Sequence, residues 1–161
     1  MNVQRLIRLA ELLEADAANP TGLKFDLGFW GVPAEFSGTG YGERDKLIES
    51  GLKLPAADKT VINCNTAACA VGLAVLSEAF AKEGLTGHID YSGQLIPEFE
   101  NNEGWDAVTR FFDINDADAA RLFTSGEYPV SKGAAAEEAV ALRIRSYVNG
   151  DNIHPTDDDE D

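Results

Sequence analysis

Hydrophobic side chains recur at intervals of three and four residues in several parts of the chain, which is the pattern of helices that bury one face. In residues 3–17, Leu6, Leu9 and Leu13 share such a face, and Asn2 can cap the first turn. The same pattern predicts three further helices. They begin at Asn102, Asn115 and Ser131. The inward face of the first holds Trp105, Val108, Phe111 and Phe112, and that of the second holds Ala119, Leu122 and Phe123. The inward face of the third holds Ala136, Val140, Ile144, Tyr147 and Val148.

The segment from Thr66 to Lys82 is apolar on almost every side and rich in alanine and glycine. Thr66 is a suitable N-cap and Gly84 a suitable stop, so we expect one helix to fill this interval. A helix without a polar face is a buried helix. Small residues such as Ala68 and Gly72 would let another element approach its backbone closely. The sequence therefore predicts that this helix lies at the centre of the core.

Shorter segments alternate between apolar and polar residues, which is typical of strands. We expect a small β element built from residues 25–30, 60–63 and 86–96, the last of these as a hairpin. Residues 31–59 contain five glycines and two prolines and are predicted to form a loop. The fold class predicted from these patterns is α+β: a mostly helical single domain around the buried, Ala/Gly-rich central helix.

The charge of the chain narrows the choice of partners. It has 13 Lys and Arg against 28 Asp and Glu, a formal net charge of -15. Direct binding to a nucleic-acid backbone requires a basic face, and so does binding to an anionic membrane, so the composition argues against both partners. We expect residues 1–150 to form the globular domain and residues 151–161, with six acids, to form an acidic C-terminal tail. The tail residues expected to contact a protein partner or a second copy in a homo-oligomer are Asp157, Asp158, Asp159, Glu160 and Asp161.

The two cysteines offer a candidate for chemistry. Cys64 follows a short apolar segment and precedes the predicted central helix, as the nucleophile of papain-like hydrolases does, and a helix N-terminus lowers the pKa of a thiol. His88 would then be the base, and Asp90 the group that orients it. The alternative is that Cys64 and Cys69 are buried structural thiols, with a local disulfide also open. Their four-residue gap and the shortage of histidines argue against a structural zinc site, and we expect no metal and no cofactor.

The stretch from Cys64 to Ala74 resembles a motif of small, uncharacterised proteins of phages and bacteria. That motif reads Cys-Gly-Thr, two residues, Cys, two residues, Gly, a large residue and Ala. Asn65 stands where the motif has Gly, and Asn is the other residue that best tolerates a positive φ. Leu73 stands where the motif usually has Trp. The resemblance implies a phage or prophage setting and no known reaction. The matching positions here are Cys64, Thr66, Cys69, Gly72 and Ala74.

We therefore expect a non-enzymatic interaction protein that docks on a larger protein or assembly, either as a host-protein-binding accessory factor or as a minor virion-associated component. The beginning of the chain shows no targeting segment, which favours the bacterial host cytoplasm or the virion. One alternative is a cysteine hydrolase, which requires an exposed Cys64 with a lowered pKa and a base within reach. The other is an acidic nucleic-acid mimic that blocks a basic groove, which requires carboxylates at phosphate-like spacing.

Overall fold

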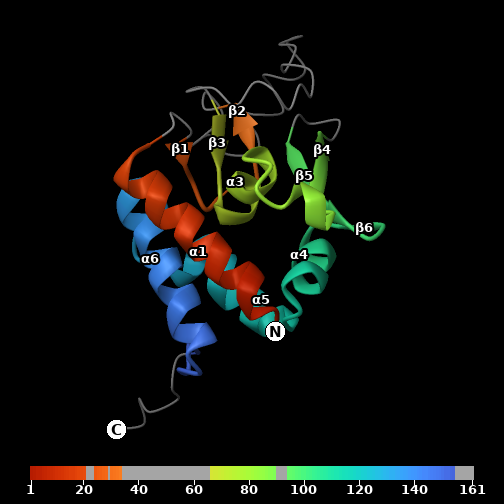
Figure 1. The fold of residues 1–161 in the computed structure, drawn as a ribbon. Helices are drawn as coiled ribbons and strands as arrows, with labels where there is room; N and C mark the ends of the chain where they lie inside the picture. The colour runs from red at the N-terminus through yellow and green to blue at the C-terminus, as the bar shows by residue number, and fades with distance from the viewer. Residues whose placement is uncertain (21–23, 29, 34–65, 90–93, 155–161) are drawn as a thin grey trace, which may run out of the picture.

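The chain folds into a small α+β domain that combines helices with two small β-sheets (Figure 1). The computed structural model describes residues 1–20, 24–28, 30–33, 66–89 and 94–154. The elements in chain order are α1 (Val3–Ala18), β1 (Lys24–Phe25), β2 (Val32–Pro33), β3 (Thr66–Ala68), α3 (Ala70–Leu76), η2 (Ala81–Glu83), β4 (Thr86–Ile89), β5 (Leu95–Phe99), β6 (Asn102–Glu103), α4 (Trp105–Phe112), α5 (Asp116–Phe123), η3 (Ser125–Glu127) and α6 (Gly133–Val148).

Helices α1 and α6 lie side by side and make the most extensive contact among the described elements (Figure 1). Leu6, Leu9 and Leu13 are fully buried, as the helical spacing predicts. The Asn2 side chain caps α1 by accepting a hydrogen bond from the Arg5 backbone N–H at 3.1 Å. The first predicted helix is therefore confirmed, together with its cap.

The predicted caps of the later helices are confirmed at one position and wrong at two. Asn115 Oδ1 accepts from the Asp118 backbone N–H at 2.7 Å and caps α5. Asn102 instead lies in β6, and its side chain donates to the carbonyl groups of the β5–β6 turn, so that α4 begins later, after Gly104. The Ser131 carbonyl group accepts from the Leu27 backbone N–H at 2.9 Å, and Lys132 is extended, so that α6 begins only at Gly133.

The predicted helix from Thr66 to Lys82 is wrong in its extent. Thr66–Ala68 is the middle strand of the first sheet, with β1 parallel on one side and β2 antiparallel on the other. The helix that follows, α3, is only seven residues long, and Glu78 adopts a left-handed conformation with φ 59° just beyond its end. Pairing with two other strands satisfies the backbone of this segment, and this outweighs the helix propensity of alanine.

The expected burial of this segment is confirmed. Every residue from Ala70 to Val75 is buried, and the helix has no polar face. Its N-cap is Cys69 rather than Thr66, because the chain leaves the sheet only after Ala68. A central Ala/Gly-rich helix therefore exists, but it is short and continues directly from a buried strand.

The predicted small β element divides into two separate sheets. The hairpin predicted within residues 86–96 is confirmed by β4 and β5, which pair antiparallel with Thr86 opposite Glu98 and Ile89 opposite Leu95. Segment 25–30 contributes only its first residue to β1. Residues 60–63 and most of the predicted loop 31–59 lie outside the described residues. The strand that joins β1 to β2 is β3.

The core contains a group of aromatic rings in edge-to-face contact. Phe111 lies 5.3 Å from Phe80, 5.1 Å from Phe99 and 4.9 Å from Phe112, measured between ring centroids. Such pairs stabilise a core beyond the area they bury. The helical spacing also predicts Trp105 in this core, and that prediction is wrong, since Trp105 is 42% exposed.

The chain continues to pack on the domain beyond Gly150, where the sequence analysis placed the beginning of the tail. Ile153 is buried, and its carbonyl group accepts a hydrogen bond from Arg121 Nε. His154 Nε2 lies 2.6 Å from Asp118 Oδ1. Residues 151–154 therefore belong to the domain, whereas the acidic residues 157–161 lie outside the described part of the chain. Each helix in the described part is too short or too polar to cross a membrane.

Candidate functional site

Two tryptophans far apart in the sequence form an aromatic pair at the margin of the core. The rings of Trp30 and Trp105 are 4.9 Å apart between centroids and inclined by 61°, an edge-to-face arrangement. Trp30 is partly buried, and Trp105 leaves 42% of its surface in solvent. Exposed tryptophan is costly in water and is enriched at the centres of protein interfaces. We refer to these two residues as the tryptophan pair.

Glycines hold the first member of the pair in place. A Cβ atom on Gly72 would lie 1.5 Å from the Trp30 carbonyl oxygen, so only glycine lets this segment rest directly on α3. The next residue, Gly31, accepts a hydrogen bond from the Leu95 backbone N–H at 2.8 Å, which ties the same segment to β5. Trp30 is therefore fixed between a buried helix and the second sheet. The sequence analysis predicted a close approach at Gly72 but not the segment that makes it.

The turn before α4 positions the second member. Gly104 has φ 62°, a left-handed conformation that favours glycine, and its N–H donates to the Pro97 carbonyl group at 2.9 Å. Trp105 is the first residue of α4, and Val108 one turn later is fully buried. The inward face predicted for α4 is therefore confirmed beyond its first turn. The first turn extends past the edge of the core and leaves the Trp105 ring partly in solvent.

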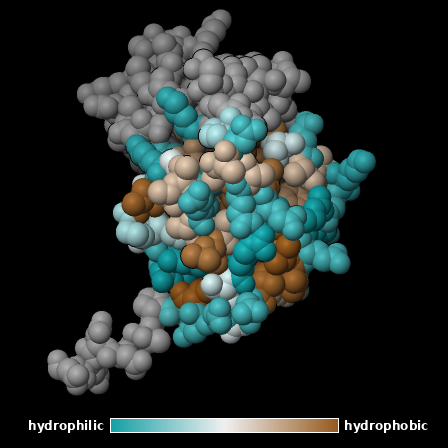
Figure 2. Space-filling view, turned by 60° about the vertical axis from the view of Figure 1, so that its left-hand side comes forward, coloured by the Kyte–Doolittle hydropathy of each residue, from teal (hydrophilic) through white to brown (hydrophobic). Residues whose placement is uncertain are grey.

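Acidic residues flank Trp105 along the chain. Glu103 precedes Trp105 by two residues, Asp106 follows it directly, and both are exposed. No Lys or Arg side chain in the described part of the chain forms an ion pair with either carboxylate. An exposed aromatic ring in an acidic segment is suited to a basic partner, because a cation is attracted to the face of the ring and to the negative charge of the surrounding surface. On the face viewed in Figure 2, hydrophobic side chains form separate patches among hydrophilic ones.

The residues proposed for a cysteine hydrolase are only partly within the described chain. Cys64 and Asp90 lie outside it. His88 lies in β4, and its nearest acidic partner is Glu98 on the neighbouring strand, with 2.9 Å between Nδ1 and Oε1. A histidine in a hairpin can pair with a residue of its own strand or with one on the neighbouring strand. The spacing of residues along the sequence does not decide between these two kinds of partner.

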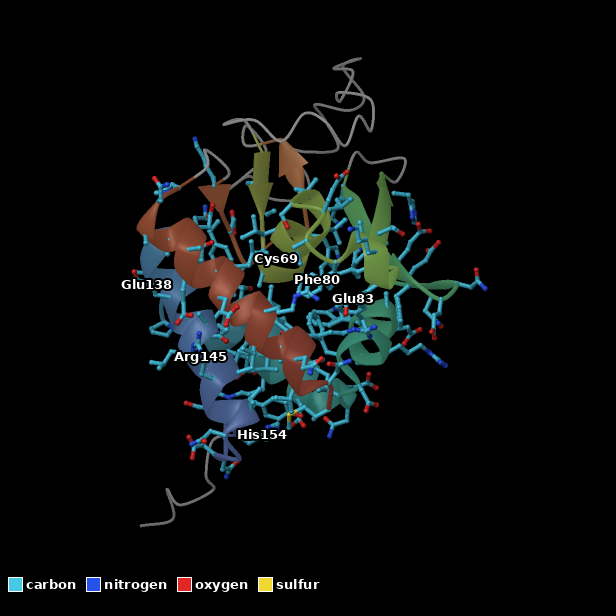
Figure 3. All side chains as sticks on the ribbon, viewed as in Figure 1. Cys69, Phe80, Glu83, Glu138, Arg145 and His154 are labelled. Atoms are coloured by element: carbon cyan, nitrogen blue, oxygen red, sulfur yellow. The ribbon has the colours of Figure 1, made fainter. Side chains whose placement is uncertain are left out.

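The other cysteine has the properties of a structural thiol. Cys69 is a free, buried cysteine at the junction of β3 and α3 (Figure 3). Its Sγ accepts a hydrogen bond from the Gly72 backbone N–H at 3.5 Å. Burial raises the pKa of the Cys69 thiol to about 11, so the thiol stays protonated at neutral pH. A protonated, buried thiol is a poor nucleophile and a poor metal ligand.

Comparison of the chain with protein-family models, with curated proteins and with solved structures finds no match. What the fold itself defines is a small α+β domain with a partly exposed aromatic pair at the margin of its core.

Proposed function

We propose that this protein is a non-enzymatic interaction protein that docks on a larger protein through the tryptophan pair. The observation that supports this most strongly is the exposure of Trp105, whose ring is held by Trp30 rather than buried in the core. A ring that is already oriented loses little conformational entropy when a partner covers it. The phage or prophage setting, and the choice between the host cytoplasm and the virion, rest on the resemblance of the cysteine motif.

The charge around Trp105 indicates which kind of surface a partner must present. Glu103 and Asp106 flank Trp105 in the sequence and are exposed, and the whole chain has a net charge of -15. We therefore propose a protein partner with an arginine or lysine at the centre of its contact surface, surrounded by further basic residues. Long-range attraction between the two surfaces would speed association, and raised salt would slow it.

A capture experiment with matched variants tests this function. Full-length parent, Trp105→Ala and Leu142→Ala proteins are each used to capture partners from cells that express the protein naturally. Leu142 is the control because it is 68% exposed and lies on α6. We expect one dominant partner to be retained by the parent and by Leu142→Ala. We expect Trp105→Ala to bind that purified partner roughly 30-fold more weakly, because truncation of a central interface residue costs about 2 kcal/mol or more.

The identity of the captured partner distinguishes the two roles: a host protein indicates an accessory factor, and a particle component indicates a virion-associated protein. Equal affinity of the parent and of Trp105→Ala for the partner would contradict docking through the tryptophan pair. The urea midpoint of Trp105→Ala must match that of the parent within experimental error. If it does not, Trp105→Phe, which keeps an aromatic ring, replaces it in the same comparison.

A further inference from the structure

We propose that His88, Glu98 and Glu103 form a binding site for a divalent transition-metal ion of the Zn²⁺ class. One possible ligand atom from each residue lies within 4.8 Å of the other two. Two of them, His88 Nδ1 and Glu98 Oε1, are 2.9 Å apart. In a site with metal–ligand bonds of about 2.1 Å, neighbouring ligand atoms lie roughly 3.0–3.4 Å apart, so only small movements would bring these atoms to bonding positions. This inference does not rest on the proposed docking function, although the two sites share Glu103: with an ion bound there, Asp106 is the carboxylate that stays free next to Trp105.

The second sheet brings these three side chains together. Strand β5 alternates in burial, with Leu95, Pro97 and Phe99 directed into the core, so that Glu98 faces outward. Strand β4 places His88 opposite Ile96, one diagonal step from Glu98 on the same face. Strand β6 places Glu103 directly opposite Glu98. Each of the three strands thus supplies one ligand to the same outward face, and a sheet is a rigid support for such a set.

The bare site has two features that a cation would remove. Like charges directly opposite each other on neighbouring strands destabilise a sheet, and Glu98 and Glu103 are such a pair. Among the described residues, no Lys or Arg forms an ion pair with either of them. His88 Nδ1 is buried and has no hydrogen-bond partner, because its close approach to Glu98 Oε1 lacks hydrogen-bond alignment. A metal ion between the three groups would coordinate this nitrogen and neutralise the carboxylate pair.

The donor atoms select the class of metal. An imidazole nitrogen with two carboxylates suits Zn²⁺ and its neighbours such as Co²⁺ and Mn²⁺. Mg²⁺ and Ca²⁺ prefer sets made only of oxygen atoms, and copper(I) and iron–sulfur sites require thiolates. The site has three protein ligands and opens to solvent at Glu103, which is exposed, so water or a partner's side chain would complete the coordination.

Calorimetric titration of the full-length protein with ZnCl2, and in parallel with MgCl2 and CaCl2, tests this site. We expect one Zn²⁺ per chain at this site and no comparable binding of Mg²⁺ or Ca²⁺. His88→Ala and the nearly isosteric Glu103→Gln should each weaken Zn²⁺ binding by at least about tenfold. Glu100→Gln, which removes an exposed carboxylate from the adjacent turn, should leave it unchanged.

Two further variants exclude other ligands. His154→Ala removes the second histidine of the chain, and Cys64→Ser removes the thiol that is not part of the buried helix cap. Both should bind Zn²⁺ as the parent does, and addition of Zn²⁺ should shift the NMR signals of the His88 ring in each. Absence of Zn²⁺ binding, or binding that survives His88→Ala or Glu103→Gln, would overturn the proposal. So would equal binding of Mg²⁺ and Ca²⁺, which would indicate a loosely bound cloud of cations on an acidic surface.

Discussion

The carbonyl oxygen of Trp30 occupies the space that any side chain on Gly72 would need, since a Cβ atom there would lie 1.5 Å from it. The same Cβ atom would lie 2.6 Å from the Trp30 carbonyl carbon. Backbone atoms cannot rotate away as the end of a flexible side chain can. This single contact therefore links the packing of the central helix to the position of the exposed tryptophan pair.

Gly72→Ala should strongly destabilise the domain, because the added methyl group must push the Trp30 segment off α3. We expect a loss of roughly 3 kcal/mol or more in the free energy of unfolding, above the usual cost of overpacking. Urea denaturation measures this loss. Gly126→Ala is the matched control, since a Cβ there would have no neighbour within 4 Å, and it should change stability by less than about 0.5 kcal/mol. An unchanged urea midpoint for Gly72→Ala would contradict the described packing.

Arg5 joins α1 to the aromatic core, and its removal should cost more than the removal of Arg8 one turn later. Arg5 donates to the Phe111 carbonyl group at 2.8 Å and lies 4.2 Å above the Phe111 ring. Arg8 pairs with Glu83, donates to the Ala79 carbonyl group at 2.8 Å and lies 4.6 Å above the Phe80 ring. Its side chain, however, is 48% exposed against 20% for Arg5, so these contacts are more solvated.

Arg5→Ala should therefore lower the free energy of unfolding by roughly 2–3 kcal/mol, from an unsatisfied carbonyl group and a lost cation–π contact. Arg8→Ala should lower it by about 1 kcal/mol, because its ion pair, its hydrogen bond and its ring contact all lie in solvent, where such interactions contribute less. Thermal and urea unfolding of both variants measure the difference. Equal losses would show that the greater burial of the Arg5 contacts adds no stability over the solvated contacts of Arg8.

Glu137 should make the domain less stable as the pH rises. It is 2% exposed, and its pKa is raised to about 9 by burial and then by a hydrogen bond with Asp16 and the charges of Asp16 and Glu138. The unfolded chain loses this proton near the ordinary value of 4.5, so between these values folding takes up a proton. Stability should then fall by up to about 1.4 kcal/mol per pH unit from roughly pH 5 to pH 9 and level off above that.

Glu137→Gln removes this titration, so the variant should show a flatter dependence of urea midpoint on pH over the same interval. Glu138→Gln, which removes the smallest of the causes that raise the pKa of Glu137, should keep the slope of the parent but level off at a slightly lower pH. Below pH 5 a separate loss is expected in all three proteins. Interactions with Arg8 and Arg5 lower the pKa of Glu83, so its contribution to stability is lost as acid protonates it. A flat profile for the parent between pH 5 and pH 9 would contradict the buried, protonated state of Glu137.

Asp118 should hold the C-terminal segment on α5. Its Oδ2 accepts from the Tyr147 hydroxyl at 2.7 Å, and its Oδ1 lies 2.6 Å from His154 Nε2. Burial raises the pKa of Asp118, but these two hydrogen-bond partners lower it, and the net result is a lowered pKa. Asp118→Asn should therefore loosen residues 151–154 and make the peptide bonds there more sensitive to added protease.

Asp116→Asn is the matched control for this change. Both aspartates lie in the first turn of α5, so both variants lose the same favourable interaction with the helix dipole. Only Asp118→Asn loses the contacts with Tyr147 and His154, and we expect it to be cleaved several-fold faster near the C-terminus. Equal cleavage rates would show that burial of Ile153 alone holds the segment.

Local patterns in the sequence were sufficient for the helices whose ends depend on nearby residues. Helices α1 and α5 begin at Asn2 and Asn115 because an Asn side chain caps a backbone N–H only three residues away. The buried leucines of α1 and the burial of Ala70–Val75 also follow from spacing and composition. The hairpin of β4 and β5 joins strands that are close in the chain, and for this reason alternation was enough to predict it.

Contacts between distant segments decided the rest. Thr66–Ala68 became a strand because β1 and β2, more than thirty residues earlier in the chain, pair with both of its edges. Trp105 has the spacing of a core residue, and its exposure depends on where the core ends relative to the first turn of α4. His88 faces Glu98 because of the register of a hairpin, which the alternation of residues along one strand does not specify. Helix caps and apolar faces act within a few residues, whereas strand pairing and the margin of a core exist only once the chain has folded.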